Sequence, residues 1–136
     1  MPDTFEEKYI DVLHNIELAL ARTYREHDDL TDFDAREAVN ALIRVYQAQL
    51  QNRAAPALQL SPLAQKAFEN AQVMCEFHLG RGTLLDKNQK PANISVYVKT
   101  VDEIVACLKR IRRSIEMWNK ELGRRGYFDF VKDYVR

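Results

Sequence analysis

The sequence predicts an all-α fold: a single-domain helical bundle over residues 1–136, with four main helices and a short C-terminal helix. Apolar residues recur along most of the chain at the spacing of one helix face. The chain has four glycines and four prolines, too few turn formers for a protein built from many strands. Its composition, 46% hydrophobic and 29% charged, excludes a disordered or collagen-like chain. No internal repeat or linker divides it.

The first two helices are expected over residues 4–28 and from Thr31 to about Arg53. Thr4 can cap the first helix, and Thr31 with Asp34 resembles a capping box for the second. The apolar face of the first helix consists of Phe5, Tyr9, Val12, Leu13, Ile16, Leu20 and Thr23. That of the second helix consists of Ala35, Val39, Leu42, Ile43, Tyr46 and Leu50.

A third helix is expected to begin at Ser61-Pro62, where serine is the N-cap and proline takes the first helical position. Its alanines at positions 64, 67 and 71 allow another helix to approach closely. Gly80 can end this helix as a left-handed cap. One long irregular crossover then covers about residues 80–99. Within it, Ile94–Val98 alternates and is rich in β-branched residues, so a short extended segment is expected there.

The fourth helix is expected to start at a capping box formed by Thr100 and Glu103 and to end before Gly123. Its apolar residues recur at alternating steps of four and three, which is the spacing of a helix-packing seam. They are Ile104, Leu108, Ile111, Ile115, Trp118 and Leu122. The aromatic segment from Tyr127 to Val135 is expected to form the short C-terminal helix.

The N-terminus and the cysteines indicate the compartment. The first twenty residues are acidic and amphipathic, without the basic and apolar stretches of a secretory signal. Charged residues interrupt every apolar run before the roughly 18 residues that a membrane span needs. Cys75 and Cys107 both lie in helical patterns, which favours reduced core residues over a disulfide. We therefore expect a cytoplasmic protein that does not bind a membrane.

Few residues suggest chemistry. Cys75 and His78 lie three residues apart and could share a ligand, with Cys107 as a third donor, but zinc needs about four ligands and no fourth stands out. Packing in the core is therefore the favoured interpretation of these residues. The chain has no glycine-rich phosphate loop, no nucleophile elbow and no Glu-x-x-His motif. We expect no catalytic residue, no metal and no cofactor, and a non-enzyme is favoured over an enzyme.

The run from Arg22 to His27 has the R-x4-H spacing that HEPN-type helical ribonucleases use. On a straight helix these two side chains lie about 140° apart and do not converge. The spacing alone therefore does not assign the chain to that family. His27, at the end of the first helix, is better placed to cap the C-terminal carbonyls of that helix.

The chain has 20 basic and 20 acidic residues and no net charge, yet the charges are unevenly distributed. Residues 1–37 carry a net charge of −7, and residues 38–136 carry +7. Lys109, Arg113 and Lys120 fall on one side of the fourth helix, opposite its apolar face. We expect a partner-binding surface at the basic end of this helix and in the segment that follows. Its residues are Lys109, Arg113, Lys120, Arg124, Arg125, Tyr127 and Phe128.

These features favour a small non-enzymatic protein-interaction or scaffold protein that associates with itself. Its acidic N-terminal region could pack beside its basic C-terminal region, either within one chain or between two copies. The alternative is a nucleic-acid-binding or RNA-processing helical domain that uses the basic stripe of the fourth helix. An enzyme with a ligand pocket near His78 and Cys75 is the third hypothesis.

Overall fold

The computed structural model describes residues 7–82, 84–122 and 126–134, and within these ranges it confirms an all-α bundle. The chain starts with a 3-10 turn, η1 (Glu7–Tyr9). The helices are α1 (Ile10–Glu26), α2 (Asp32–Leu50), α3 (Pro62–Gly82), α4 (Ile94–Leu122) and α5 (Gly126–Tyr134). Thr4, the predicted cap of the first helix, lies outside the described residues.

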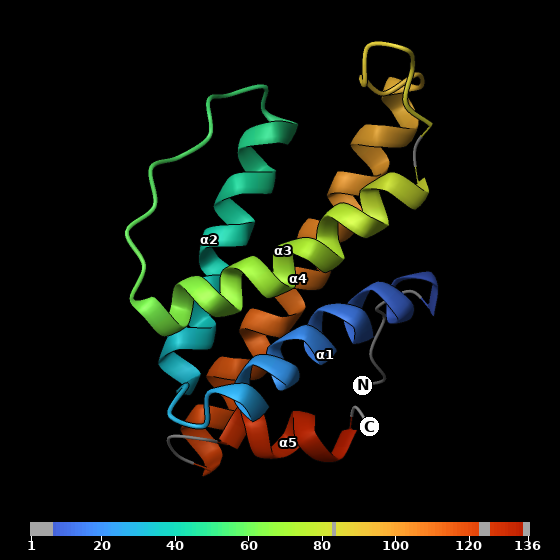
Figure 1. The fold of residues 1–136 in the computed structure, drawn as a ribbon. Helices are drawn as coiled ribbons and strands as arrows, with labels where there is room; N and C mark the ends of the chain where they lie inside the picture. Colours follow the sequence, from blue (N-terminus) through green and yellow to red (C-terminus); the bar gives the residue numbers. More distant parts are fainter. Residues whose placement is uncertain (1–6, 83, 123–125, 135–136) are drawn as a thin grey trace.

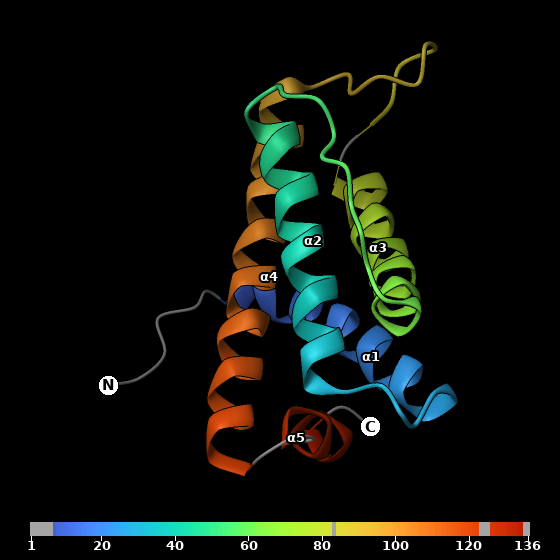
Figure 2. The ribbon, with the colours of Figure 1, turned by 90° about the vertical axis from the view of Figure 1, so that its left-hand side faces the viewer.

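The long helices form two antiparallel pairs. Helices α2 and α4 run side by side in opposite directions, and α1 and α3 cross them on one side (Figures 1 and 2). The short helix α5 lies across one end of the bundle, in contact with α1 and α4. The turn over residues 84–93 and the start of α4 lie at the opposite end. Among the described residues, each helix is too short or too polar to cross a lipid bilayer.

The core consists of the apolar faces that the sequence predicts. Along α4, Ile104, Leu108, Ile111 and Ile115 are all fully or almost fully buried. Ala64, Ala67 and Ala71 on α3 have no exposed surface, as expected for residues that let a neighbouring helix approach closely. Burial of these side chains provides the main favourable contribution to folding, because each removes apolar surface from water.

Side-chain caps begin α2 and α3 as predicted. Thr31 and Asp34 form the capping box of α2: the Asp34 amide donates to Thr31 Oγ1 over 3.3 Å, and the Thr31 amide donates to Asp34 Oδ2 over 3.0 Å. Ser61 Oγ accepts from the amide of Ala64 over 3.2 Å at the start of α3. The Ser61 hydroxyl also donates to Asp34 Oδ1 over 3.1 Å, which ties the starts of the two helices together.

The predicted start of the fourth helix is wrong. Residues 94–98 are helical, and Asn93 caps α4 by accepting a hydrogen bond at Oδ1 from the amide of Val96 over 3.1 Å. Thr100 therefore lies inside the helix, where its hydroxyl donates to the carbonyl of Val96 over 2.7 Å. The alternation of Ile94, Val96 and Val98 favours a strand locally, but the described residues offer no strand for this segment to pair with, and helical structure satisfies its backbone groups.

The crossover is consequently shorter than the predicted residues 80–99. Helix α3 continues through Gly80 to Gly82, so Gly80 is not a left-handed cap. Residues 84–93 form a tight turn in which Leu85 pairs with Pro91. Asp86 stabilises the turn, because its Oδ1 accepts from the amides of Asn88 and Lys90 over 2.8 and 3.0 Å.

Candidate interaction surfaces

The basic residues of α4 lie on an exposed surface. Lys109 and Arg113, one helical turn apart, are both exposed and form no ion pair with another described side chain. Arg112 is half-buried and donates from Nη1 to Asn40 Oδ1 on α2 over 3.4 Å. The side chain of Lys120, and Arg124 and Arg125 entirely, lie outside the described residues. Within the described part of the chain, Lys109 and Arg113 are therefore what the structure places on the predicted surface.

Tyr127 and Phe128 are not on that surface. Both side chains are buried, and the Phe128 ring stacks on Tyr24 of α1 with ring centroids 4.6 Å apart. The Tyr127 amide donates to Asp32 Oδ2 over 3.1 Å, so α5 is attached to the start of α2. These two aromatic side chains close the end of the bundle, where they bury a large area. Their assignment to the partner-binding surface is corrected: neither has exposed side-chain area to offer.

Two buried carboxylates beneath α5 were missed in the sequence. Glu17 on α1 is only 3% exposed, and Asp32 at the start of α2 is also buried. Glu17 Oε2 accepts a long hydrogen bond, 3.4 Å, from the hydroxyl of Tyr127. Burial raises the pKa of the Glu17 carboxyl from its ordinary 4.5 to about 7, which the hydrogen bond from Tyr127 only partly opposes. The signal was available, since Glu17 lies between Leu13 and Leu20 on the apolar face of its helix.

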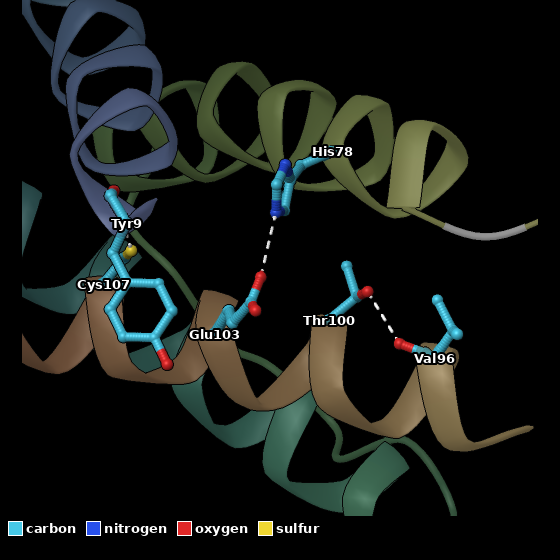
Figure 3. Close-up of polar contacts among 6 residues, drawn as sticks. All are labelled: Tyr9, His78, Val96, Thr100, Glu103 and Cys107. Carbon is cyan, nitrogen blue, oxygen red and sulfur yellow. Dashed lines mark hydrogen bonds and ion pairs between the residues drawn. The ribbon is translucent and has the colours of Figure 1, made fainter. Parts of the chain in front are cut away.

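The cysteines and His78 lie between α3 and α4 without forming a ligand cluster. His78 Nε2 lies 3.6 Å from Glu103 Oε2, and Cys107 directs its S–H at the carbonyl of Tyr9 over 3.6 Å (Figure 3). Burial raises the pKa of Cys107 to about 12 and raises that of Cys75 further above its ordinary value. Both thiols are therefore poor nucleophiles and poor metal ligands. Among the described residues, no three histidine, cysteine or acidic side chains are arranged to hold a metal ion.

A second polar contact joins α2 and α3. The fully buried Tyr46 donates its hydroxyl to Oε2 of Glu76, and burial raises the pKa of Tyr46 far above its ordinary value. Tyr97 at the start of α4 donates to Gln49 Oε1 on α2 over 2.7 Å. The amphipathic pattern of α2 predicts that Tyr46 is buried, but the partner on α3 depends on how the helices pack.

Arg22 and His27 lie apart. Arg22 lines an open groove between α1 and α3, about 210 Å³ in volume, together with Glu26, Asn70 and Met74. His27 is the C-cap residue of α1, and it is its backbone N–H that donates to the carbonyl of Thr23 over 2.9 Å. His27 does not line the groove that Arg22 lines, so the R-x4-H spacing does not place these two residues in one site.

The exposed apolar side chains are concentrated at one end of the bundle. Of nine large exposed hydrophobic residues in the described ranges, five come from residues 84–98. They are Leu84, Leu85, Ile94, Val96 and Val98, which we call the apolar end. Ile94 and Val98, one helical turn apart, also line a shallow hollow with Leu50, Ser95, Lys99 and Asp102.

Exposed aromatic side chains elsewhere are partly covered. The guanidinium of Arg36 lies 5.3 Å from the ring centroid of Phe33, and that of Arg81 lies 5.6 Å from the ring centroid of Phe77. Such cation–π contacts stabilise an aromatic ring at the surface. The side chains of the apolar end are aliphatic, so they have no equivalent contact. These exposed aliphatic side chains are therefore candidates for burial against another molecule, which would remove their apolar area from water.

Comparisons with protein-family models, with curated proteins and with solved structures found no match to this chain.

Proposed function

We propose that this chain is a small, non-enzymatic interaction protein that associates with itself through the apolar end. The observation that supports the proposal is the grouping of Leu84, Leu85, Ile94 and Val98 at one end of the bundle, where Leu84 is 82% and Ile94 65% exposed. Exposed apolar side chains gathered at one end of a molecule favour an interface, because monomeric proteins seldom expose large apolar patches. Each of these side chains releases water when a partner covers it.

The charges around the apolar end favour a second copy as the occupant. Lys99 and Asp102 lie beside Ile94 and Val98 on the same hollow. In a two-fold symmetric interface, the same patch must fit itself, so a surface of one charge sign would repel its copy. The hollow carries one cation and one anion, and the adjoining turn carries Asp86 with Lys87 and Lys90, so both charge signs are present and the requirement is met. The absence of net charge on the whole chain likewise removes long-range repulsion between copies.

Light scattering coupled to size-exclusion chromatography tests the proposal. The wild-type protein is expected to be a dimer, and the double variant Ile94→Glu/Val98→Glu a folded monomer, because burying two carboxylates in an apolar interface is strongly unfavourable. Met117→Glu is the matched control, since Met117 is 51% exposed on the same helix but near its other end. A monomeric wild type, or a dimer that survives in the double variant, contradicts the proposal.

A nucleic-acid-binding function is the second candidate. Its support is the pair of exposed cations Lys109 and Arg113, which form no ion pair with a described side chain. Filter binding to single- and double-stranded RNA and DNA at two salt concentrations tests it. Phosphate contacts predict binding that weakens steeply with salt and is reduced by Lys109→Gln/Arg113→Gln. No binding, or binding insensitive to salt, counts against this candidate.

A further inference from the structure

Helix α5 covers a buried acidic side chain. It lies across the end of the bundle against α1, with Tyr127, Phe128 and Val131 on its buried side (Figure 1). Beneath it, Glu17 of α1 is 3% exposed. The contact between the two helices includes the 3.4 Å hydrogen bond from the Tyr127 hydroxyl to Glu17 Oε2.

Glu17 lacks the partners that a buried carboxylate needs. Its Oε1 is buried and has no hydrogen-bond partner, and the bond at Oε2 is long. A carboxylate removed from water needs a nearby cation or several short hydrogen bonds, whereas a protonated carboxyl is neutral and is buried at much lower cost. The geometry therefore fits the protonated form.

The groups that face Glu17 do not supply positive charge. They are Tyr127 from α5 and the Cys107 thiol from α4. Asp32 of α2, also an acid, contacts Tyr127 instead, where it accepts from the backbone amide. No described cation lowers the pKa of Glu17, which burial raises to about 7. His14, one turn earlier on α1, is half-buried, and Arg124 and Arg125 lie outside the described residues.

We propose that the proton on Glu17 favours docking of α5, so that ionisation of this side chain weakens docking and promotes the release of α5 from the bundle. The helix is the element that yields because it has nine residues and is attached at one end of the molecule. Its departure exposes Glu17 to water and with it the rings of Tyr24 and Phe128, which stack in the docked state. This inference is independent of the proposed self-association, since the apolar end lies at the opposite end of the bundle.

Hydrogen–deuterium exchange of the full chain tests the proposal. Between about pH 6 and about pH 8, protection of the α5 amides is expected to fall about tenfold beyond the intrinsic change in exchange rate, and α5 is expected to stay less protected than α2 at both pH values. In Glu17→Gln, which has no proton to lose, the protection of α5 is expected to be independent of pH. Tyr127→Phe removes the hydroxyl whose hydrogen bond lowers the pKa of Glu17. The midpoint of the pH-dependent loss of α5 protection is therefore expected to move to higher pH in this variant.

His14→Gln is the control, because His14 lies one turn before Glu17 on the same helix. It is expected to leave the pH dependence of α5 unchanged. The proposal is overturned by α5 protection that does not depend on pH in the wild type, by a dependence that persists in Glu17→Gln, or by one that disappears in His14→Gln. Equal protection of α5 and α2 at both pH values also overturns it, because α5 then opens only when the whole bundle unfolds.

Discussion

At the scale of single residues, Glu17 differs from most glutamates in its burial and in its pKa. A glutamate has an ordinary pKa of 4.5 and is seldom buried unless paired, yet here it lies among the apolar residues of α1 with a pKa of about 7. Its neighbours in sequence predict the burial, because Leu13, Ile16 and Leu20 share its helix face. Its one hydrogen-bond partner among the described residues, Tyr127, is 110 residues away along the chain, so only the tertiary fold brings the two side chains together.

Stability is expected to depend on the ionisation of Glu17. Because its pKa rises from 4.5 in the unfolded chain to about 7 in the folded chain, the folded state retains a proton that the unfolded state loses between these values. The free energy of unfolding therefore falls as pH rises through this range, by up to about 3 kcal/mol. Urea denaturation of Glu17→Gln is expected to lack this decrease. Identical pH profiles of variant and wild type contradict the prediction.

Tyr46 gives a second prediction for a single residue. Tyr46→Phe keeps the buried ring and removes the hydroxyl that donates to Glu76. A hydrogen bond to a charged acceptor contributes about 1.5–3 kcal/mol, so the variant is expected to be destabilised by about that amount in urea denaturation. Tyr97→Phe, which loses a bond to Gln49 at a less buried position, is the control and is expected to cost less. Equal losses contradict the prediction.

At the scale of elements, α4 shows where local pattern and tertiary structure disagree. The buried face from Ile104 to Ile115 could be predicted from the sequence, because apolar residues on one face of a helix recur at regular intervals. Its start was misread because β-branched residues at 94, 96 and 98 favour strands, whereas the Asn93 cap and the contact of Tyr97 with Gln49 favour a helix. Thr100 and Glu103 match a capping box in sequence, but this motif also occurs inside a helix.

The first turns of α4 are expected to depend on the Asn93 cap. Asn93→Ala removes the side-chain oxygen that accepts from the amide of Val96 and is expected to cost about 1 kcal/mol. Asn93→Asp keeps an acceptor and is expected to retain the wild-type stability. Faster hydrogen exchange at residues 94–98, with unchanged exchange in α2, is the diagnostic result. A destabilisation of Asn93→Asp equal to that of Asn93→Ala argues against capping.

At the scale of the whole molecule, the described helices contact one another mainly through a continuous apolar core. Helix α1, which carries three acidic and two basic side chains, packs more extensively on α3 than on the basic helix α4. Lys109 and Arg113 remain exposed on the surface. Burial of apolar side chains between the two helix pairs is the main favourable contribution to folding, as the continuous buried core indicates.

Salt separates the two ways in which copies could associate. A dimer formed through the apolar end is expected to persist from about 0.05 M to about 0.5 M salt, since screening acts on charges and not on apolar burial. A dimer formed by acidic and basic regions is expected to dissociate over the same range. Sedimentation velocity at both salt concentrations measures the difference, and dissociation at high salt contradicts association through the apolar end.

The sequence by itself determined the all-α class, the four long helices with a short fifth, most of the core and the caps of α2 and α3. These depend on periodicity and on contacts three or four residues apart, which are visible along one segment. Only the tertiary structure decided that Tyr127 and Phe128 are buried, that Glu17 lies beneath α5 and that aliphatic residues gather at the other end. Each of these depends on which helices meet, and residues about a hundred positions apart are brought together only when the whole chain packs.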